Sequence, residues 1–355
     1  MISIGIVILL SFSTVQSIGI VYSNHSFKID FLSNHVQTTI IINPYEKINF
    51  DTIHHYKANL HTHTLNSDGS SSPAEVIYFY HDIGDYDILS ITDHNKNTWP
   101  WTKYIPEDAV SSSKSSAYYP DLEMLAISGN EMSLNHHRNS LLNGYSGGGL
   151  FLHFAFWIVE KKQGLSFFNH PGRYDYPVEW YQRYFDKFDS LVGIEVYNQG
   201  DRYDQDRLLW DQINKQRDPD DLIWGLSNDD IHHLKRDAFR NYQYFFMNDL
   251  IESAFRSSLE QGSFYFCYEP NGSDVTGLTY GQAMTPRLTE VKIMGDTIQL
   301  TGESYDMIEW IDENSQIIDT GDVIDVSSFG SKFVRAVLVN EYGRTYTQPF
   351  GLLPK

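Results

Sequence analysis

Between residues 56 and 270 the chain repeats one local pattern, in which a short apolar run is followed at once by histidines or carboxylates. Longer segments with helical spacing separate these runs. Strands that alternate with helices form parallel βα units, and in a barrel of such units the side chains that follow each strand gather at one end. The predicted strands are 56–60, 88–92, 125–129, 164–168, 192–196 and 222–226, and the predicted helices are 73–83, 151–162, 179–185, 203–215 and 250–261.

Three of the segments that follow strands are rich in metal-ligating side chains. They read NLHTHTLNSD (59–68), ITDHN (91–95) and SNDDIHH (227–233). Neutral imidazole nitrogens and carboxylate oxygens suit Zn²⁺, Mn²⁺ or Fe²⁺, and several carboxylates offset the charge of adjacent ions. The pattern predicts a multinuclear centre for metal-assisted hydrolysis, with the candidate ligands His61, His63, Asp68, His94, Asp230 and His232.

Further strand ends add candidate ligands from GNEMS (129–133) and FNHPGR (168–173). Glu131 could bridge two ions through its two oxygens, and His170 is a candidate ligand. His136 and His137 are neighbours that point in different directions, so we expect only one of them to be a ligand. Arg173 offers a planar fork of donors for a phosphate oxygen.

The roles of the remaining polar residues are less determined. Glu195, in GIEVYN (193–198), could support a ligand, contact substrate or serve only as a structural hydrogen-bond acceptor. Asp229 and His233 flank the ligand candidates of SNDDIHH and could orient them. The segment 97–121 could line a substrate pocket or be an ordinary packed loop.

The charge balance restricts the partners. The chain of 355 residues has 26 Lys and Arg against 46 Asp and Glu, so its formal charge is −20. Binding to nucleic acid draws its affinity from clustered Lys and Arg, and no basic run is present. We therefore expect a small-molecule substrate and no nucleic acid. Cys267 is the single cysteine, so no intramolecular disulfide is possible, and we expect a buried thiol.

The N-terminal segment ISIGIVILLSFSTV (2–15) is uncharged and apolar. It has the character of a signal-peptide core, which predicts a signal peptide at 1–17 and a secreted or cell-envelope protein. An uncleaved anchor and an ordinary buried strand are the alternatives. Nothing later in the chain approaches the roughly 20 apolar residues that a membrane span requires. Residues 18–55 are expected to form short lead-in strands.

A second region begins after a change of composition. Residues 271–286 have the character of a linker, and residues 287–355 show short alternating strands separated by Gly and Asp turns. This texture predicts a small Ig-like β-sandwich with Trp310 in its core. Its role is open, with binding of protein or carbohydrate as the options.

The motifs taken together resemble those of the PHP (polymerase and histidinol phosphatase) superfamily of metal-dependent phosphoesterases. The match consists of HTHTLNSDG, ITDHN, GNEMS, NHPGR and SNDDIHH, and it covers roughly residues 56–267. The resemblance implies a distorted (β/α)7 barrel at 56–270 and two to three divalent ions of Zn, Mn or Fe. By resemblance, one ion has His61, His63, Glu131 and Asp230, a second has Glu131, His137 and His170, and a third has Asp68, His94 and His232.

The predicted reaction is hydrolysis of a small phosphomonoester or nucleotide-like phosphoester by a metal-bridging hydroxide. Arg173, His233 and Asp93 are the predicted catalytic residues, with His233 or a metal-bound water as the proton donor to the leaving group. Two alternatives remain. The same centre could hydrolyse an amide or another non-phosphate bond, because the pocket rather than the metals selects the substrate. A vestigial barrel beside a binding module is the non-enzymatic alternative.

Overall fold

The structure is a computed structural model that describes residues 16–23, 26–33, 38–105, 116–119, 122–272 and 285–354. Most of the predicted signal peptide and of the predicted linker therefore lies outside the described residues. Within them the chain forms an α/β barrel followed by an all-β region of antiparallel strands. This is the fold class that the sequence predicts.

The barrel wall is a mainly parallel sheet. β4 (His54–Asn59) pairs in parallel with β5 (Ile88–Ile91), and β5 pairs in parallel with β7 (Met124–Met132). The other half is also parallel, in the order β9 (Leu165–Phe168), β10 (Leu191–Asn198) and β11 (Trp224–Asn228). An isolated parallel bridge between Thr62 and Ile231 joins the chain just beyond β4 to the chain just beyond β11. The two ends of the wall thus meet at the edge where the ligand motifs lie.

Several strands within residues 56–270 were not predicted and pair antiparallel with their neighbours, and one of them lies in the barrel wall. β8 (Arg138–Leu141) runs antiparallel between β7 and β9, whereas the sequence predicts only parallel strands in this region. The four residues of β8 are all buried, although the segment reads RNSL and lacks apolar alternation. Polar residues buried inside a barrel do not show the periodicity by which a strand is recognised in a sequence.

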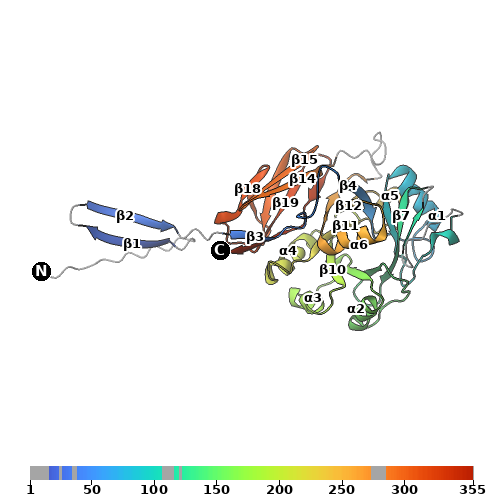
Figure 1. The fold of residues 1–355 in the computed structure, drawn as a ribbon. Coiled ribbons are helices and arrows are strands. Elements are labelled where there is room, and N and C mark those ends of the chain that lie inside the picture. Colours follow the sequence, from blue (N-terminus) through green and yellow to red (C-terminus); the bar gives the residue numbers. More distant parts are fainter. Residues whose placement is uncertain are drawn as a thin grey trace.

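Helices cover the outside of the barrel, as Figure 1 shows. α1 begins as its sequence predicts, because the Ser72 hydroxyl caps the helix, Glu75 completes a capping box and Pro73 is the first helical residue. The helical elements are α1 (Pro73–Tyr78), η1 (Phe79–Ile83), η2 (Trp101–Lys103), α2 (Leu152–Lys161), η3 (Pro171–Arg173), α3 (Val178–Phe185), α4 (Asp206–Gln216), α5 (Leu234–Asp237), α6 (Glu252–Gln261) and η5 (Val326–Ser328). No helix among the described residues is long and apolar enough to cross a membrane.

The barrel sheet continues into the C-terminal region. β12 (Asn241–Met247) pairs antiparallel with β4, β13 (Phe264–Tyr268) pairs with β12, and β20 (Arg344–Tyr346) pairs with β13. Figure 1 shows the C-terminal strands packed beside this side of the barrel. The other strands of this region are β14 (Arg287–Met294), β15 (Thr297–Glu303), β16 (Met307–Asp312), β17 (Ile317–Thr320), β18 (Val323–Asp325), β19 (Phe333–Val339) and β21 (Phe350–Pro354).

The remaining strands come from the N-terminal part and from one loop. β3 (Thr38–Ile42) is one of the short lead-in strands expected in residues 18–55, and it pairs with β21, so the chain before the barrel contacts the last strand. β1 (Gln16–Ser23) and β2 (Ser26–Ser33) form an antiparallel hairpin. β6 (Ser116–Tyr119) pairs with β7, and Trp101 packs against Tyr119 in the core. The described part of 97–121 is therefore a packed loop.

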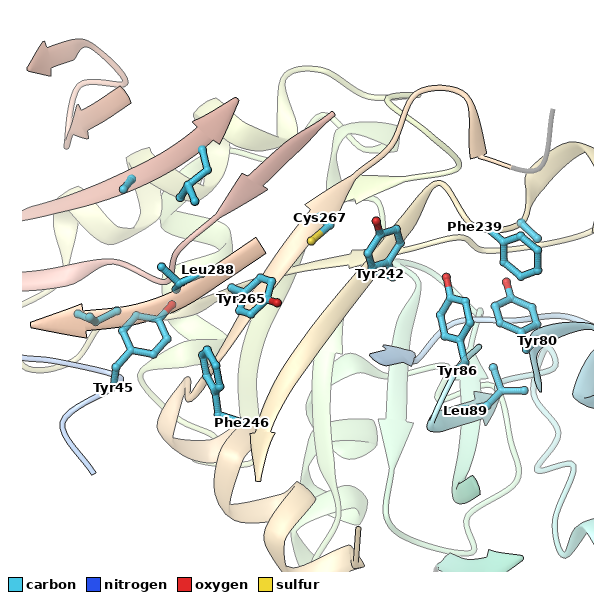
Figure 2. Close-up of a cluster of buried hydrophobic side chains, with 14 of the residues drawn as sticks. Tyr45, Tyr80, Tyr86, Leu89, Phe239, Tyr242, Phe246, Tyr265, Cys267 and Leu288 are labelled. Carbon is cyan, nitrogen blue, oxygen red and sulfur yellow. The ribbon is translucent and has the colours of Figure 1, made fainter. Parts of the chain in front are cut away.

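One hydrophobic core spans the barrel and the C-terminal strands. Figure 2 shows a run of buried side chains from Tyr80 through Tyr242 and Cys267 to Leu288. Cys267 is the buried thiol that the sequence predicts, and burial raises the pKa of this thiol to about 12. Trp310 is buried in the same core and donates a hydrogen bond to the Gly321 carbonyl oxygen at 2.8 Å.

Candidate metal centre

The strand-end loops bring the predicted ligands together in one cavity of about 160 Å³. The cavity lies at the carboxyl ends of the barrel strands, where the Thr62–Ile231 bridge closes the wall. His61 and His63 lie just below its surface, and each is almost fully buried. The residues that line the cavity are Asp68, His94, Glu131, His137, His170, Arg173, Gln199, Arg202, Tyr203, Asp230 and His232.

Three side chains form the innermost cluster. The Nε2 atoms of His61 and His63 are 3.1 Å apart, and the Asp230 Oδ1 atom lies 3.3 Å from the first and 3.0 Å from the second. Ligand atoms around a tetrahedral Zn²⁺, at bond lengths of about 2.0–2.1 Å, are separated by roughly 3.3 Å. The three donor atoms are therefore spaced like the ligands of a single ion.

Glu131 lies at the middle of the site, and both of its oxygens face histidines. Its Oε1 is 2.9 Å from His137 Nδ1 and 3.4 Å from His170 Nε2, and its Oε2 is 2.7 Å from His94 Nδ1. Glu131 Oε1 is also 3.3 Å from His61 Nε2. A carboxylate in this position can bridge two ions, as the sequence predicts.

A third group of donors lies at the mouth of the cavity. Asp68 Oδ2 is 3.4 Å from His94 Nε2 and 3.3 Å from His232 Nε2, and Asp68 Oδ1 is 3.7 Å from His63 Nδ1. His63 and His94 thus each belong to two groups of converging donors. The resemblance assigned each of these histidines to one ion, whereas in the structure each of them lies between two groups of donor atoms.

The geometry of these donor atoms suits coordination of metal ions better than hydrogen bonding among themselves. Although His94 Nδ1 and Glu131 Oε2 are 2.7 Å apart, their geometry is not that of a hydrogen bond, and both atoms are buried without a hydrogen-bond partner among the described residues. His170 Nδ1 is likewise buried and unpartnered there. Buried polar atoms without partners are costly, and clusters of them indicate an unseen ion or ligand.

Surrounding carboxylates control the charge of the cluster. Burial disfavours protonation of His61, but the charges of Asp230, Glu195 and Glu131 outweigh it and hold the His61 pKa well above its usual value. Burial likewise disfavours ionisation of Glu131, yet His61, together with hydrogen bonds from the neighbouring histidines, holds the Glu131 pKa well below its usual value. The carboxylates are therefore ionised, and a bound cation would displace the proton that they hold on His61.

Glu195 orients two of the predicted ligands. Its Oε1 accepts from His61 Nδ1 at 2.9 Å, and its Oε2 accepts from the backbone N–H of His170 at 2.8 Å. The side-chain amides of Asn198 and Asn228 each donate to the same carboxylate at 2.9 Å. A carboxylate behind a ligating histidine fixes the ring and its tautomer. Of the roles left open by the sequence, Glu195 therefore has that of a support for ligands.

The structure does not place Asp93 at the cavity. The Asp93 carboxylate accepts hydrogen bonds from Thr64 N at 2.7 Å, Thr64 Oγ1 at 2.8 Å and Ser67 Oγ at 2.7 Å. The Thr98 hydroxyl donates to it as well. The predicted catalytic role is therefore corrected, because Asp93 holds the HTHTLNSD loop in shape and does not face substrate.

His233 and His136 are also outside the cavity. His233 is exposed at the start of α5, where its backbone N–H donates to Asp237 Oδ2 at 2.9 Å, so it does not line the predicted reaction site. His136 is buried, with Nε2 3.0 Å from the Tyr181 hydroxyl, while His137 faces Glu131. The geometry thus agrees with the choice of His137 as the ligand.

Asp229 is a structural residue. It is fully buried and accepts from the Tyr80 hydroxyl at 2.6 Å and from the backbone N–H groups of Phe239, Arg240 and Asn241 at 2.9 Å each. Burial raises the Asp229 pKa to about 6 despite these donors. The next residue, Asp230, has a φ of 48°, and this left-handed backbone turns its side chain away from that of Asp229.

Three residues that line the cavity were not predicted. Gln199, Arg202 and Tyr203 follow β10, and Arg202 lies over the Tyr203 ring at 5.1 Å. They obey the rule that polar residues after a barrel strand reach the active end. Glu195 is the site residue predicted on this segment, and Gln199 lies four residues after it, so the same rule applied further along the segment predicts all three.

The barrel, with its cluster of His, Asp and Glu side chains, and the all-β region that follows it have a counterpart among solved structures. Among solved structures, a two-domain protein from Bacteroides vulgatus that contains a predicted PHP-like metal-dependent phosphoesterase is similar to 88% of this chain and 90% of its own, with a TM-score of 0.50 and 16% identity. The fold of this chain is therefore that of a two-domain PHP-like protein.

Two other solved structures are similar to a smaller share of the chain. The lesion-specific endonuclease PfuEndoQ from Pyrococcus furiosus matches 58% of the chain and 56% of its own length, with a TM-score of 0.40 and 14% identity. An amidohydrolase from Chromobacterium violaceum with bound SO4 matches 57% of the chain and 96% of its own, with a TM-score of 0.39 and 15% identity. No family model and no curated protein sequence matches the chain.

Proposed function

We propose that the chain is a metal-dependent phosphoesterase acting on a small phosphomonoester or nucleotide-like ester. The observation that carries this proposal is the presence of Arg173 and Arg202 in the cavity that contains the convergent ligands. The Arg173 guanidinium forms no hydrogen bond or ion pair with the described residues, and its ring contact among them is with Tyr174 at 5.9 Å. An arginine with free donors in a chain of charge −20 is well suited to bind an anionic substrate.

The residues divide the work between them. Glu131 and Asp230, with the surrounding histidines, would hold two to three divalent ions, for which Zn, Mn and Fe have matching donor preferences. Such ions lower the pKa of bound water and neutralise charge on a phosphoryl group. Arg173 and Arg202 would bind non-bridging phosphate oxygens and thereby orient the ester. Glu195 keeps His61 aligned during this chemistry.

The experiment combines metal analysis with a substrate panel. Protein lacking residues 1–17 is loaded with Zn²⁺, Mn²⁺ or Fe²⁺ and assayed on phosphomonoesters, phosphodiesters and amides. We expect two to three ions per chain and turnover of a phosphoester, which Arg173→Ala reduces mainly through a higher KM. Arg183→Ala is the matched control, because Arg183 is an exposed arginine of α3 that does not line the cavity. Turnover of an amide and of no phosphoester would establish the alternative hydrolase.

The location and partners of the protein form a separate proposal. The uncharged segment 2–15 supports export to the cell envelope or beyond, and the formal charge of −20 supports a small-molecule substrate rather than nucleic acid. Fractionation of cells that express the full chain, with N-terminal sequencing of the product, tests the first point. A product that retains residues 1–17 in the cytoplasm would contradict it.

A further inference from the structure

A second cavity, of about 430 Å³, adjoins the metal centre because both cavities share Arg173. It lies between the loop that follows η3 and one face of α4. We call it the side groove, and the residues that matter for its chemistry are Arg173, Tyr174, Tyr176, Gln205, Leu208 and Gln212. A substrate whose phosphate lies at Arg173 would therefore have room to extend into the side groove.

One wall of the side groove is aromatic and firmly supported. The Tyr176 ring stacks on Trp180 with centroids 4.1 Å apart and an angle of 7° between the planes. The Tyr174 ring stacks on the buried His136 with centroids 4.1 Å apart. Tyr176 nevertheless remains 39% exposed. A ring that already stacks on a neighbour presents a flat surface to a ligand. Because the ring is already held in place, little side-chain conformational entropy is lost when the ligand binds.

The facing wall is a helical stripe with one apolar and two amide side chains. Gln205 is the residue immediately before α4, Leu208 lies three residues further on, and Gln212 lies four residues after Leu208. This spacing places the three side chains on one face of the helix. Leu208 is 46% exposed. Gln205 Nε2 donates to the Gly172 carbonyl oxygen at 2.8 Å, which leaves its amide oxygen as an acceptor. The side chain of Gln212 forms no hydrogen bond with the other described residues.

We propose that the side groove binds the leaving group of the substrate, and that this leaving group is a nucleoside whose base lies between Tyr176 and Leu208. This inference rests on the proposed phosphoesterase function. A base has two flat apolar faces and a hydrogen-bonding edge, which match the rings, the leucine and the two amides. Arg173 is the one cationic side chain that lines the groove, and Asp175 adds a carboxylate, so the groove suits one phosphate at its entrance and does not follow a polyanionic strand.

The test compares adenosine monophosphate with glycerol phosphate on the metal-loaded full chain. Leu208→Glu places a carboxylate where the base would stack, and we expect the ratio of kcat/KM for the nucleotide to that for glycerol phosphate to fall about tenfold, as loss of one base stack predicts. Tyr176→Ala should lower the ratio in the same direction. Ile317→Glu is the matched control, since Ile317 is a comparably exposed apolar residue on β17, and it should keep the wild-type ratio.

Binding of adenosine without phosphate gives an independent readout. Saturation-transfer NMR on the metal-loaded protein should detect adenosine with the wild type and with Ile317→Glu, and the signal should be lost with Leu208→Glu. An unchanged ratio in Leu208→Glu, or an equal loss on both esters, would overturn the side-groove proposal while leaving the phosphoesterase intact. Absence of all phosphoester hydrolysis together with adenosine binding that depends on Leu208 would instead overturn the proposed function and retain the groove as a nucleoside site.

Discussion

Two buried clusters of charged side chains in this molecule have opposite hydrogen-bonding states. Where α4 meets β19, Arg335 donates from Nε and Nη2 to the two oxygens of Asp211 at 2.8 and 2.7 Å, and Ser315 adds a bond at 2.6 Å. In the metal centre, Glu131 and His94 approach to 2.7 Å without forming a hydrogen bond. The first cluster is completed largely within the chain, whereas the second converges on positions that a metal ion would occupy. Buried charged side chains by themselves therefore do not identify a metal site. Donor atoms that converge on a common position do identify one.

The largest effect that this comparison predicts is loss of the metal centre. His63→Ala removes a side chain shared by two groups of donors, so we expect loss of at least one ion per chain and a fall in kcat of at least about a thousandfold, since a catalytic metal contributes several kcal/mol to the transition state. Elemental analysis and phosphoester assays measure both. His153→Ala, at an exposed histidine of α2, is the control. Full metal content in His63→Ala would show that the convergent geometry does not reflect metal binding.

The completed cluster predicts a loss of stability instead of activity. Asp211→Ala leaves the buried Arg335 without its carboxylate, which costs about 3–5 kcal/mol of unfolding free energy. Denaturant unfolding measures this loss, and the metal content should stay at the wild-type value. The double variant Asp211→Ala with Arg335→Met should recover much of the stability, because no unpaired charge remains. A loss below about 1 kcal/mol in the single variant would contradict the tight pairing that the distances indicate.

A third buried carboxylate tests the cost of incomplete pairing. Burial raises the pKa of Glu269 from 4.5 to about 7, while Lys57 and hydrogen bonds from Tyr242 and Thr285 lower it only in part. The folded state therefore binds a proton more tightly than the unfolded state, so this group stabilises the fold fully below about pH 4.5 and loses that contribution as the pH rises to about 7.

We expect Glu269→Gln to remove about 1–3 kcal/mol of this decline, as the size of the shift implies. Unfolding free energies of both proteins at pH 5, 6, 7 and 8, in the same metal buffer, give the difference. Parallel curves for the two proteins would mean that Glu269 titrates near its ordinary pKa in the folded state.

The smallest effect concerns the support of the ligands. Glu195→Gln keeps the size of the side chain but replaces the charged acceptor behind His61, so metal affinity should fall about 10- to 100-fold. Activity should return when the metal concentration is raised, which separates this role from a direct contact with substrate. Glu179→Gln, on the exposed surface of α3, should leave the affinity unchanged. Failure of added metal to restore Glu195→Gln would indicate a role in the reaction itself.

The sequence by itself determined the local elements and the type of site. Apolar runs such as 88–92, ended by TDHN, predict β5 and the ligands that follow it, because strand periodicity and donor chemistry are local properties. The same holds for α1, where Ser72 and Pro73 define the start of the helix. The spacing of His61 and His63 was sufficient to place both in one cluster, since alternate residues at a strand end point to the same side.

Only the tertiary structure decided how distant segments share these residues. Asp93 and Asp229 have the sequence context of ligands, yet the first is held mainly by hydroxyls of the HTHTLNSD loop and the second by backbone N–H groups of residues 239–241. The joining of β13 to β20 likewise depends on a partner far along the chain, and the antiparallel direction of β8 depends on its pairing with both β7 and β9. Orientation and burial arise from packing between such partners, so a one-dimensional pattern does not contain them.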